Sequence, residues 1–263
     1  MLNIIIVATL YIISIFTILA TKYIPHYQFL LSQMSHENSF FESVGTIALF
    51  LIFFYGIYAL KRYRFNRYKK ITIVIFSILG FLAGMEEISW GQQIFHFPTS
   101  EYFAQHNIQD ETNLHNLIDG NLFSSIVYSS VYTLLIFIPL IYKLSPMLHR
   151  FKLLRYFDID PNIILVVLFG STFQLYFYND IGVIVDMITL FLALALFGLF
   201  LILKKTDRLV KIHFFIVVIT MLISMLSHSI YSFYNMQYEI RESFIELASL
   251  FIFIQLIQKE KRD

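Results

Sequence analysis

The sequence predicts an all-α, polytopic membrane protein with eight transmembrane helices and both termini in the cytoplasm. Two observations lead to this prediction. First, 58% of the 263 residues are hydrophobic and only 14% are charged, with a mean hydropathy of +0.70, whereas soluble domains carry about 25% charged residues. Second, the charges gather in short clusters between apolar runs of about 20 residues, the length that crosses the hydrocarbon core. We therefore expect residues 1–263 to form one transmembrane helical domain.

The predicted helices follow from the apolar runs and from the residues that interrupt them. The first run lacks the basic start of a signal peptide, so we expect an uncleaved helix. Pro139 near the end of the fourth run is compatible with a kink, and Pro161 suits the first turn of the fifth helix after Asp160. Only Asn179 and Asp180 separate the fifth and sixth runs, which indicates a tight helical hairpin. The eight runs are 2–20, 39–60, 71–91, 122–142, 161–178, 181–203, 211–234 and 239–258.

The basic residues set the orientation of these helices. In an eight-helix arrangement every Lys and Arg except Lys22 and Arg241 falls on the same side. The positive-inside rule places that side, and both termini, in the cytoplasm, and the expected location is the bacterial cytoplasmic membrane. The formal net charge of +1 gives no reason to expect a nucleic-acid partner. The absence of cysteine excludes disulfides, thiolate zinc sites and cysteine nucleophiles.

Most acidic residues map to the opposite, outer side. Topology alone does not explain this bias, because Asp and Glu contribute little to the positive-inside rule. The polar residues of the helices also concentrate in the outer halves, and we expect almost no buried polar residues in the inner halves. The outer acids are Glu37, Glu42, Glu86, Glu87, Glu101, Asp110, Glu111, Asp119, Asp180, Asp186, Glu239, Glu242 and Glu246.

Several of these acids are predicted to lie below the membrane surface. In a helix over 71–91, Trp90 lies about 28 Å from Ile71, at the outer interface, with Glu86 and Glu87 about 6 Å deeper. Carboxylates at that depth are usually paired, protonated or bound to a cation. Further acidic or imidazole side chains are expected at the same height on other helices: Glu42, Asp186, His228 and the stripe Glu239, Glu242 and Glu246.

The stretch 84–121 between the third and fourth runs contains no Lys or Arg. A short amphipathic turn is expected from Thr99 or Ser100 to Gln105. A second helical piece from Asp110 would place Glu111 and His115 on one face, a spacing that suits a divalent cation or an acid–base pair. The loop 92–121 is thus expected to carry part of the site, and its amides could bind a polar head group.

The segments EEISWGQQ (86–93) and NIQDETNLHNL (107–117) resemble a block in uncharacterised bacterial multi-pass membrane proteins. This resemblance covers about 35 residues and extends more loosely to Glu42 and to the helix of Glu242 and Glu246. It implies a shared site without naming a reaction.

A weaker resemblance is to the intramembrane CAAX-protease-like family, which pairs a Glu-Glu motif with later histidines on an eight-helix fold. Gly91 and Gln92 stand where that family has Arg, and Ser232 stands where it has Asn. The His-x-x-x-His pair of alkaline-ceramidase-like hydrolases, a third comparison, is absent. The residues that match the protease plan are Glu86, Glu87, His115 and His228.

These features lead to the hypothesis of a membrane-embedded, metal-assisted hydrolase or transferase that acts on a lipid or lipid-linked substrate at the outer face. A divalent cation, Zn or Mg, would activate water or polarise a carbonyl or phosphoryl group. Expected partners are membrane lipids and the substrate. The predicted catalytic residues are Glu86, Glu87 and His115. The predicted metal ligands are Glu111, His115, His228, Glu242 and Glu246. The predicted substrate-binding residues are Trp90, Gln92, Asn107, Gln109, Asn113 and Asn116.

Two other classes remain open at this point. The same acids could serve a cation or proton transporter or channel. The chain could instead be a non-catalytic subunit or scaffold of an envelope assembly, in which replacement of Glu86, Glu111 or His115 would affect stability alone.

Overall fold

Helices form every regular element of the described residues. Each predicted apolar run corresponds to a helical segment. The computed structural model describes residues 2–24, 40–107, 111–114, 121–174, 181–227 and 234–259. The long helical segments are α1 (Leu2–Tyr23), α3 (Phe40–Arg62), α4 (Arg67–Glu87), α7 (Asn121–Tyr132) continued by η3 (Thr133–Phe137) and α8 (Ile138–Leu144), α9 (Pro161–Ser171), α10 (Ile181–Leu203), α11 (Arg208–Ser227) and α12 (Tyr234–Lys259).

Five of these segments are long and apolar enough to cross a membrane, which indicates a membrane protein. They are α3, α4, α10, α11 and the segment Ile126–Leu144. The apolar stretches within α1 and α9 are shorter, at Ile5–Thr17 and Pro161–Ser171. The first half of α12 carries several charges. A crossing by α1, α9 and α12, and the cytoplasmic position of the termini, stay predictions.

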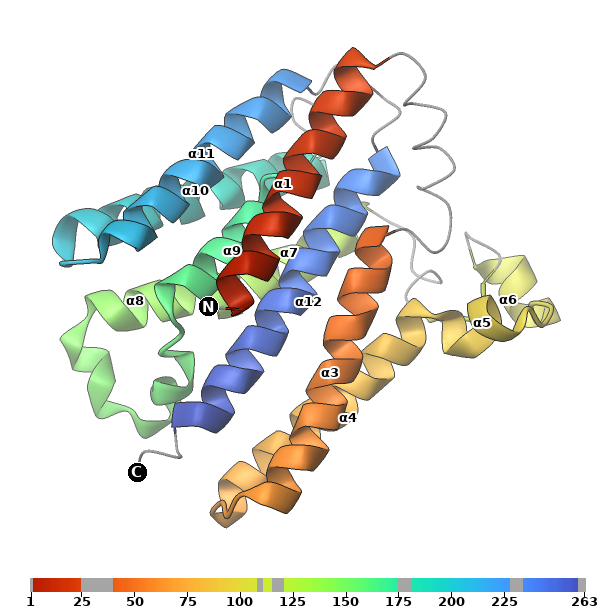
Figure 1. Cartoon of the computed structure of the whole chain (residues 1–263), viewed down its shortest axis with the longest axis horizontal. Helices are drawn as coiled ribbons and strands as arrows, with labels where there is room; N and C mark the ends of the chain where they lie inside the picture. The colour runs from red at the N-terminus through yellow and green to blue at the C-terminus, as the bar shows by residue number, and fades with distance from the viewer. Residues whose placement is uncertain are drawn as a thin grey trace.

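The helix α12 joins two parts of the fold (Figure 1). On one side it packs against α3, which forms a hairpin with α4. On the other side it packs against α9, which also contacts α11, while α7 packs against α10 and α1 against α11. Residues carried by α12 therefore face both the α3–α4 hairpin and the remaining helices.

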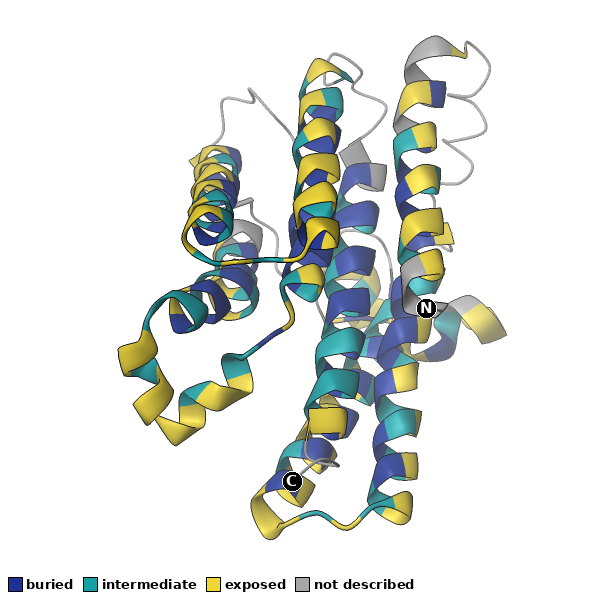
Figure 2. Ribbon diagram, turned by 60° about the vertical axis from the view of Figure 1, so that its left-hand side comes forward, coloured by how far each residue is buried: buried dark blue, intermediate teal, exposed yellow. Residues whose placement is uncertain are grey.

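The burial pattern suits a lipid-facing exterior. On α3, Ala48, Leu49 and Ile52 are buried, whereas Ile47 and Phe54 are 58% and 61% exposed. The same division runs along the other helices, whose outward faces are exposed in Figure 2. Exposed apolar surface of this extent marks a face that is covered by lipid or by another protein.

Local sequence accounts for the start of α9 and for the irregularity before α8. Asp160 is the N-cap of α9, its carboxylate accepts a hydrogen bond from the Asn162 backbone N–H at 2.8 Å, and Pro161 fills the first turn as predicted. The π-helical segment η3 ends directly before α8, which contains Pro139. Because proline lacks an N–H and crowds the preceding turn, a local change of helical pitch accommodates it. The predicted hairpin at Asn179 and Asp180 lies outside the described residues.

Three expectations need correction. The helix predicted over 71–91 is wrong at its end, since α4 stops at Glu87. Residues 111–114 are not helical, so the helical piece predicted from Asp110 is absent there. The halves of the helices predicted to be inner do contain buried polar groups: Lys69 is 1% exposed and donates to the Leu256 carbonyl at 2.6 Å. Tyr11, also buried, pairs with His213 Nε2 at 2.6 Å. The amphipathic turn is α6 (Glu101–His106), with Ser100 at its N-cap position.

Candidate functional site

Carboxylates from three helices gather at the end of the bundle that the sequence places outside. Glu87 lies within electrostatic range of Glu242, Glu42, Glu111 and Glu86. Glu246 lies within range of Glu87, Glu242, Glu239 and Glu42. The structure thus brings together acids from α3, α4 and α12, as the sequence predicted. We call the half-buried residues Glu42, Glu87, Glu239, Glu242 and Glu246 the acidic cluster.

A glycine of α3 makes room for one member of this cluster. A Cβ atom at Gly45 would overlap Glu246 Oε2 and would lie 3.3 Å from the Ser243 Cα of α12. The missing side chain therefore lets the two helices approach closely and places the Glu246 carboxylate directly on the α3 backbone. The position of Glu246 is accordingly fixed by packing.

Beside the acidic cluster, α12 carries a fully buried arginine. Arg241 is 1% exposed, and its Nη1 donates to Asp186 Oδ2 of α10 at 2.9 Å. Its guanidinium carbon lies 3.1 Å from the centre of the Tyr128 ring of α7, and the Tyr128 hydroxyl donates to Glu242. Among the residues that the structure describes, Arg241 Nε and Nη2 have no hydrogen-bond partner. Asp186, predicted to lie level with the acids, is thus used to hold Arg241.

A turn with left-handed backbone follows α4. Ser89, Trp90 and Gly91 have φ values of 46°, 55° and 93°. This conformation is costly for Ser and Trp, and it persists only where surrounding contacts fix it. Those contacts are present: Ser89 Oγ donates to Glu111 Oε2 at 2.5 Å, and Trp90 Nε1 donates to Glu86 Oε1 at 2.5 Å. The turn leads the chain from α4 into the short helix α5 (Gln92–Phe95).

The segment 111–114 is held against this turn by side chains that the sequence assigned to chemistry. Glu111 is 5% exposed, and its Oε2 also accepts from Asn113 Nδ2 at 2.7 Å. Asn107 Nδ2 donates to Asn113 Oδ1 at 2.9 Å. Glu86 Oε2 accepts from the Leu114 backbone N–H at 2.6 Å. Glu86 and Glu111 therefore help to build the loop.

Gln92 also bonds within the loop. Its Oε1 accepts from the Thr112 backbone N–H at 2.7 Å, and its Nε2 donates to Thr99 Oγ1 at 2.7 Å. Gln92, Asn107 and Asn113 are thus loop-building amides, and a role in binding substrate stays a prediction. Trp90, in contrast, is 41% exposed.

The predicted set of metal ligands is only partly described. His115, His228, Gln109 and Asn116 lie outside the described residues. Within the described ranges, no group of three or more His, Asp or Glu residues is arranged to hold a metal ion. The chemistry of the donors that are present still fits a hard divalent cation such as Mg²⁺, because the acidic cluster offers carboxylate oxygens.

Sequence reasoning missed the residues that position the acids. Neither Ser89 nor Tyr128 belongs to a recognisable sequence motif. Their hydrogen bonds to Glu111 and Glu242 form only when segments distant in sequence pack together. Arg241 did carry a signal, as one of two basic residues on the predicted outer side. Its pairing with Asp186 explains why a charge stands there.

Comparison with models of protein families, with curated proteins and with solved structures finds no match to this chain. The fold and the site define a class: a protein whose described residues form helices, five of them able to cross a membrane, with a carboxylate cluster at one end.

Proposed function

We propose that the chain is a membrane-embedded, metal-assisted hydrolase or transferase that acts on a lipid or lipid-linked substrate at the outer face of the membrane. The observation that carries the proposal is the convergence of half-buried carboxylates from α3, α4 and α12 beside the buried Arg241. Like charges that lie close together in a partly dry site lower the stability of the fold. Groups of this kind are concentrated at functional sites, where their chemistry is needed.

The roles follow from what each side chain contacts. Glu242 and Glu246, together with the predicted ligands Glu111, His115 and His228, would hold the cation, which supplies Lewis-acid activation of an oxygen when it is bound. Glu87 is assigned as the general base, because no described residue holds its carboxylate in the way that loop residues hold those of Glu86 and Glu111. Arg241 has two N–H-bearing nitrogens to spare and would bind an oxyanion of the substrate.

The surroundings of the site support a lipid substrate. Aromatic side chains of the turn and of the following segment are exposed: Trp90 is 41%, Phe95 77% and Tyr102 61% exposed. Amphipathic aromatic side chains are typical of the membrane–water interface. A substrate that is anchored in the outer leaflet would therefore reach the acidic cluster without leaving the membrane.

The test measures bound metal and lipid turnover in the purified protein. Protein in nanodiscs is incubated with total bacterial membrane lipids and Mg²⁺ or Zn²⁺, and metal content and lipid products are followed by mass spectrometry. Glu87→Gln should retain metal and lose turnover, and Glu246→Gln should lose both. The matched control is Glu101→Gln, an exposed acid of α6, which should change neither. Wild-type protein that is folded but binds neither metal would contradict the proposal.

A transporter is the second candidate, and one observation favours it. A chain of polar groups runs through the predicted inner half: Asn162 Nδ2 donates to Asp160 Oδ1 at 3.1 Å, Asn162 Oδ1 lies 3.4 Å from His213 Nδ1, and His213 Nε2 pairs with the Tyr11 hydroxyl. Proton or Na⁺ flux into liposomes that is lost in both Glu87→Gln and His213→Gln would favour transport over catalysis.

A further inference from the structure

A second polar site lies at the opposite, predicted cytoplasmic end of the molecule. A cavity of about 570 Å³ opens between α8, the start of α9, and the link from α10 to α11. Its apolar wall includes Pro161, Phe200 and Val210, and its basic lining includes Lys143, Lys204 and Lys205. The volume is in the range of sites that hold small molecules or head groups.

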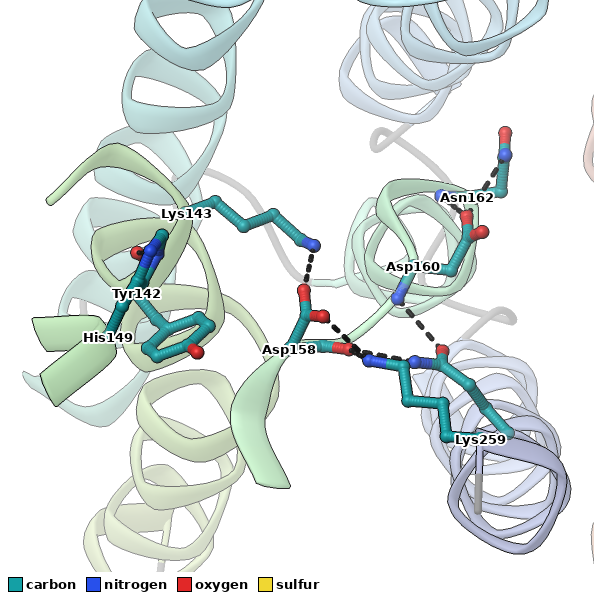
Figure 3. Close-up of polar contacts among 8 residues, drawn as sticks. Tyr142, Lys143, His149, Asp158, Asp160, Asn162 and Lys259 are labelled. Carbon is teal, nitrogen blue, oxygen red and sulfur yellow. Dashed lines mark hydrogen bonds and ion pairs between the residues drawn. The ribbon is translucent and has the colours of Figure 1, made fainter. Parts of the chain in front are cut away.

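Two of the acids at this cavity are already engaged. The Asp158 carboxylate forms ion pairs with Lys143 Nζ at 2.6 Å and with Lys259 Nζ at 2.7 Å (Figure 3). Asp160 caps α9 through the Asn162 backbone N–H. The third acid, Asp207, is exposed. His149 also lines the cavity, and its Nε2 is held by the Tyr142 carbonyl at 3.0 Å.

Two lysines that line the cavity, Lys204 and Lys205, are not paired with an acid in this way. Lys204 is half-buried and Lys205 is exposed, and the ammonium group of neither forms a hydrogen bond or ion pair with any residue that the structure describes. Next to them, the buried Thr206 hydroxyl has no hydrogen-bond partner in the described part of the chain. Two ammonium groups and one hydroxyl, all potential donors, therefore border the cavity without acceptors.

The position of these donors relates them to the membrane surface. Leu203, directly before them along the chain, and Leu209, three residues after Thr206, are 61% and 67% exposed. Both belong to helices that are apolar enough to cross a membrane. The lysines therefore stand where the apolar surface ends, which is the level of lipid phosphates, and cytoplasmic leaflets are rich in anionic lipids.

We propose that this cavity binds a phosphate group through Lys204, Lys205 and Thr206, and that the phosphate belongs to an anionic lipid head group. Lys143 and Lys259 hold Asp158 at the edge of the cavity, so that this carboxylate does not compete for the free lysines. Free phosphate has the same chemistry and is the alternative source that the experiment separates. The site is distinct from the acidic cluster and does not depend on the function proposed above.

The experiment uses the full chain purified in a neutral detergent. Thermal stability and native mass spectra are recorded with dioctanoyl phosphatidylglycerol, with dioctanoyl phosphatidylcholine and with inorganic phosphate. We expect phosphatidylglycerol alone to raise Tm and to remain bound. The double variant Lys204→Gln/Lys205→Gln should bind it about tenfold more weakly or worse, because each lysine contributes to attraction by the phosphate. The control Lys61→Gln/Lys70→Gln removes two exposed lysines elsewhere on the same predicted face and should bind normally.

Each other outcome has a definite meaning. Equal binding of phosphatidylglycerol by the double variant and the wild type would overturn the proposal, and so would equal stabilisation by phosphatidylcholine. Stabilisation by inorganic phosphate that displaces the lipid would overturn the lipid source and identify free phosphate as the ligand. If the double variant does not fold, Lys205→Gln alone serves instead, since the exposed Lys205 has no structural partner, and unchanged binding there would also overturn the proposal.

Discussion

At the scale of single residues, the acidic cluster depends on small steric features as much as on charge. Glu246 occupies space that a side chain at position 45 would need, so the identity of Gly45 decides where that carboxylate lies. Arg241 is held by Asp186 and Tyr128, and the Tyr128 hydroxyl in turn donates to Glu242 of the acidic cluster.

Replacement of Gly45 by Ala should therefore displace Glu246. Overpacking of this kind costs about 1–3 kcal/mol of unfolding free energy. The control is Gly198→Ala, where the added methyl group would meet only the Phe214 ring at 3.9 Å. That helical substitution should be neutral or stabilising by up to about 1 kcal/mol. Unfolding of both variants in detergent, followed by circular dichroism, provides the comparison, and equal stability would show that Glu246 does not occupy the space over Gly45.

Separation of the Arg241–Asp186 pair should be far more costly. Arg241→Met or Asp186→Leu alone leaves a buried group without its partner, and each should lose about 3–5 kcal/mol. The combined change Arg241→Met/Asp186→Leu should recover much of that loss. For contrast, Lys259→Gln removes a pair in which both side chains are more than 40% exposed, and about 0–1 kcal/mol is expected. A double-mutant cycle on unfolding free energies measures the coupling, and additive single effects would contradict it.

At the scale of elements, the loop before α9 is tied to the end of α12. The Asp158 carboxylate forms ion pairs with Lys143 and Lys259. The Gln255 side chain of α12 donates to the Asp158 carbonyl at 2.7 Å and accepts from the Asp160 backbone N–H at 2.9 Å. Partial burial alone would raise the pKa of Asp158, but hydrogen bonds from Lys143 and Lys259 outweigh it and lower the pKa below its ordinary value of 3.8.

The sign of the pH dependence follows from that lowered pKa. The stabilisation by Asp158 is present above its unfolded pKa and is lost as the pH falls through the lower folded pKa. Asp158→Asn should therefore be slightly less stable than the wild type at pH 7, and the difference should shrink progressively as the pH falls below 3.8. Because the side chain is 43% exposed, solvent screening keeps the effect small. Tm measured from pH 7 to pH 2.5 checks this, and a difference that grows toward low pH would refute the assignment.

The boundaries of the elements show what the sequence could and could not predict. The long helices followed from apolar length, and the start of α9 from Asp160 and Pro161, because these signals are local. The end of α4 could not be predicted in this way, because the left-handed backbone of Ser89 and Trp90 is stabilised by hydrogen bonds to Glu111 and Glu86. The proximity of Glu87 to Glu242 was predicted from the depth of both residues along their helices. The contact of the Glu246 carboxylate with Gly45, in contrast, depends on how α3 and α12 pack.

At the scale of the whole molecule, the predicted orientation in the membrane can be tested with single cysteines. The chain contains no cysteine, so single cysteines report their own exposure without a background. A cysteine at Lys70 should react with an impermeant maleimide only from the cytoplasmic side, and a cysteine at Glu101 only from the outer side. Labelling of intact cells and of inverted vesicles distinguishes the two. Reaction of both residues from the same side would overturn the predicted topology.

The central place of α12 has a consequence for how the protein is made. The α3–α4 hairpin leaves the ribosome long before α12, yet α12 supplies Arg241, Glu242 and Glu246 and covers Gly45. During insertion the early hairpin therefore exposes Glu42 and Glu87, together with the space over Gly45 that α12 later fills. Only when α12 docks between α3 and α9 are the two halves of the cluster united. Completion of the site is thus a late event of biogenesis, and a chain interrupted before α12 would present its first acids without the helix that makes them a site.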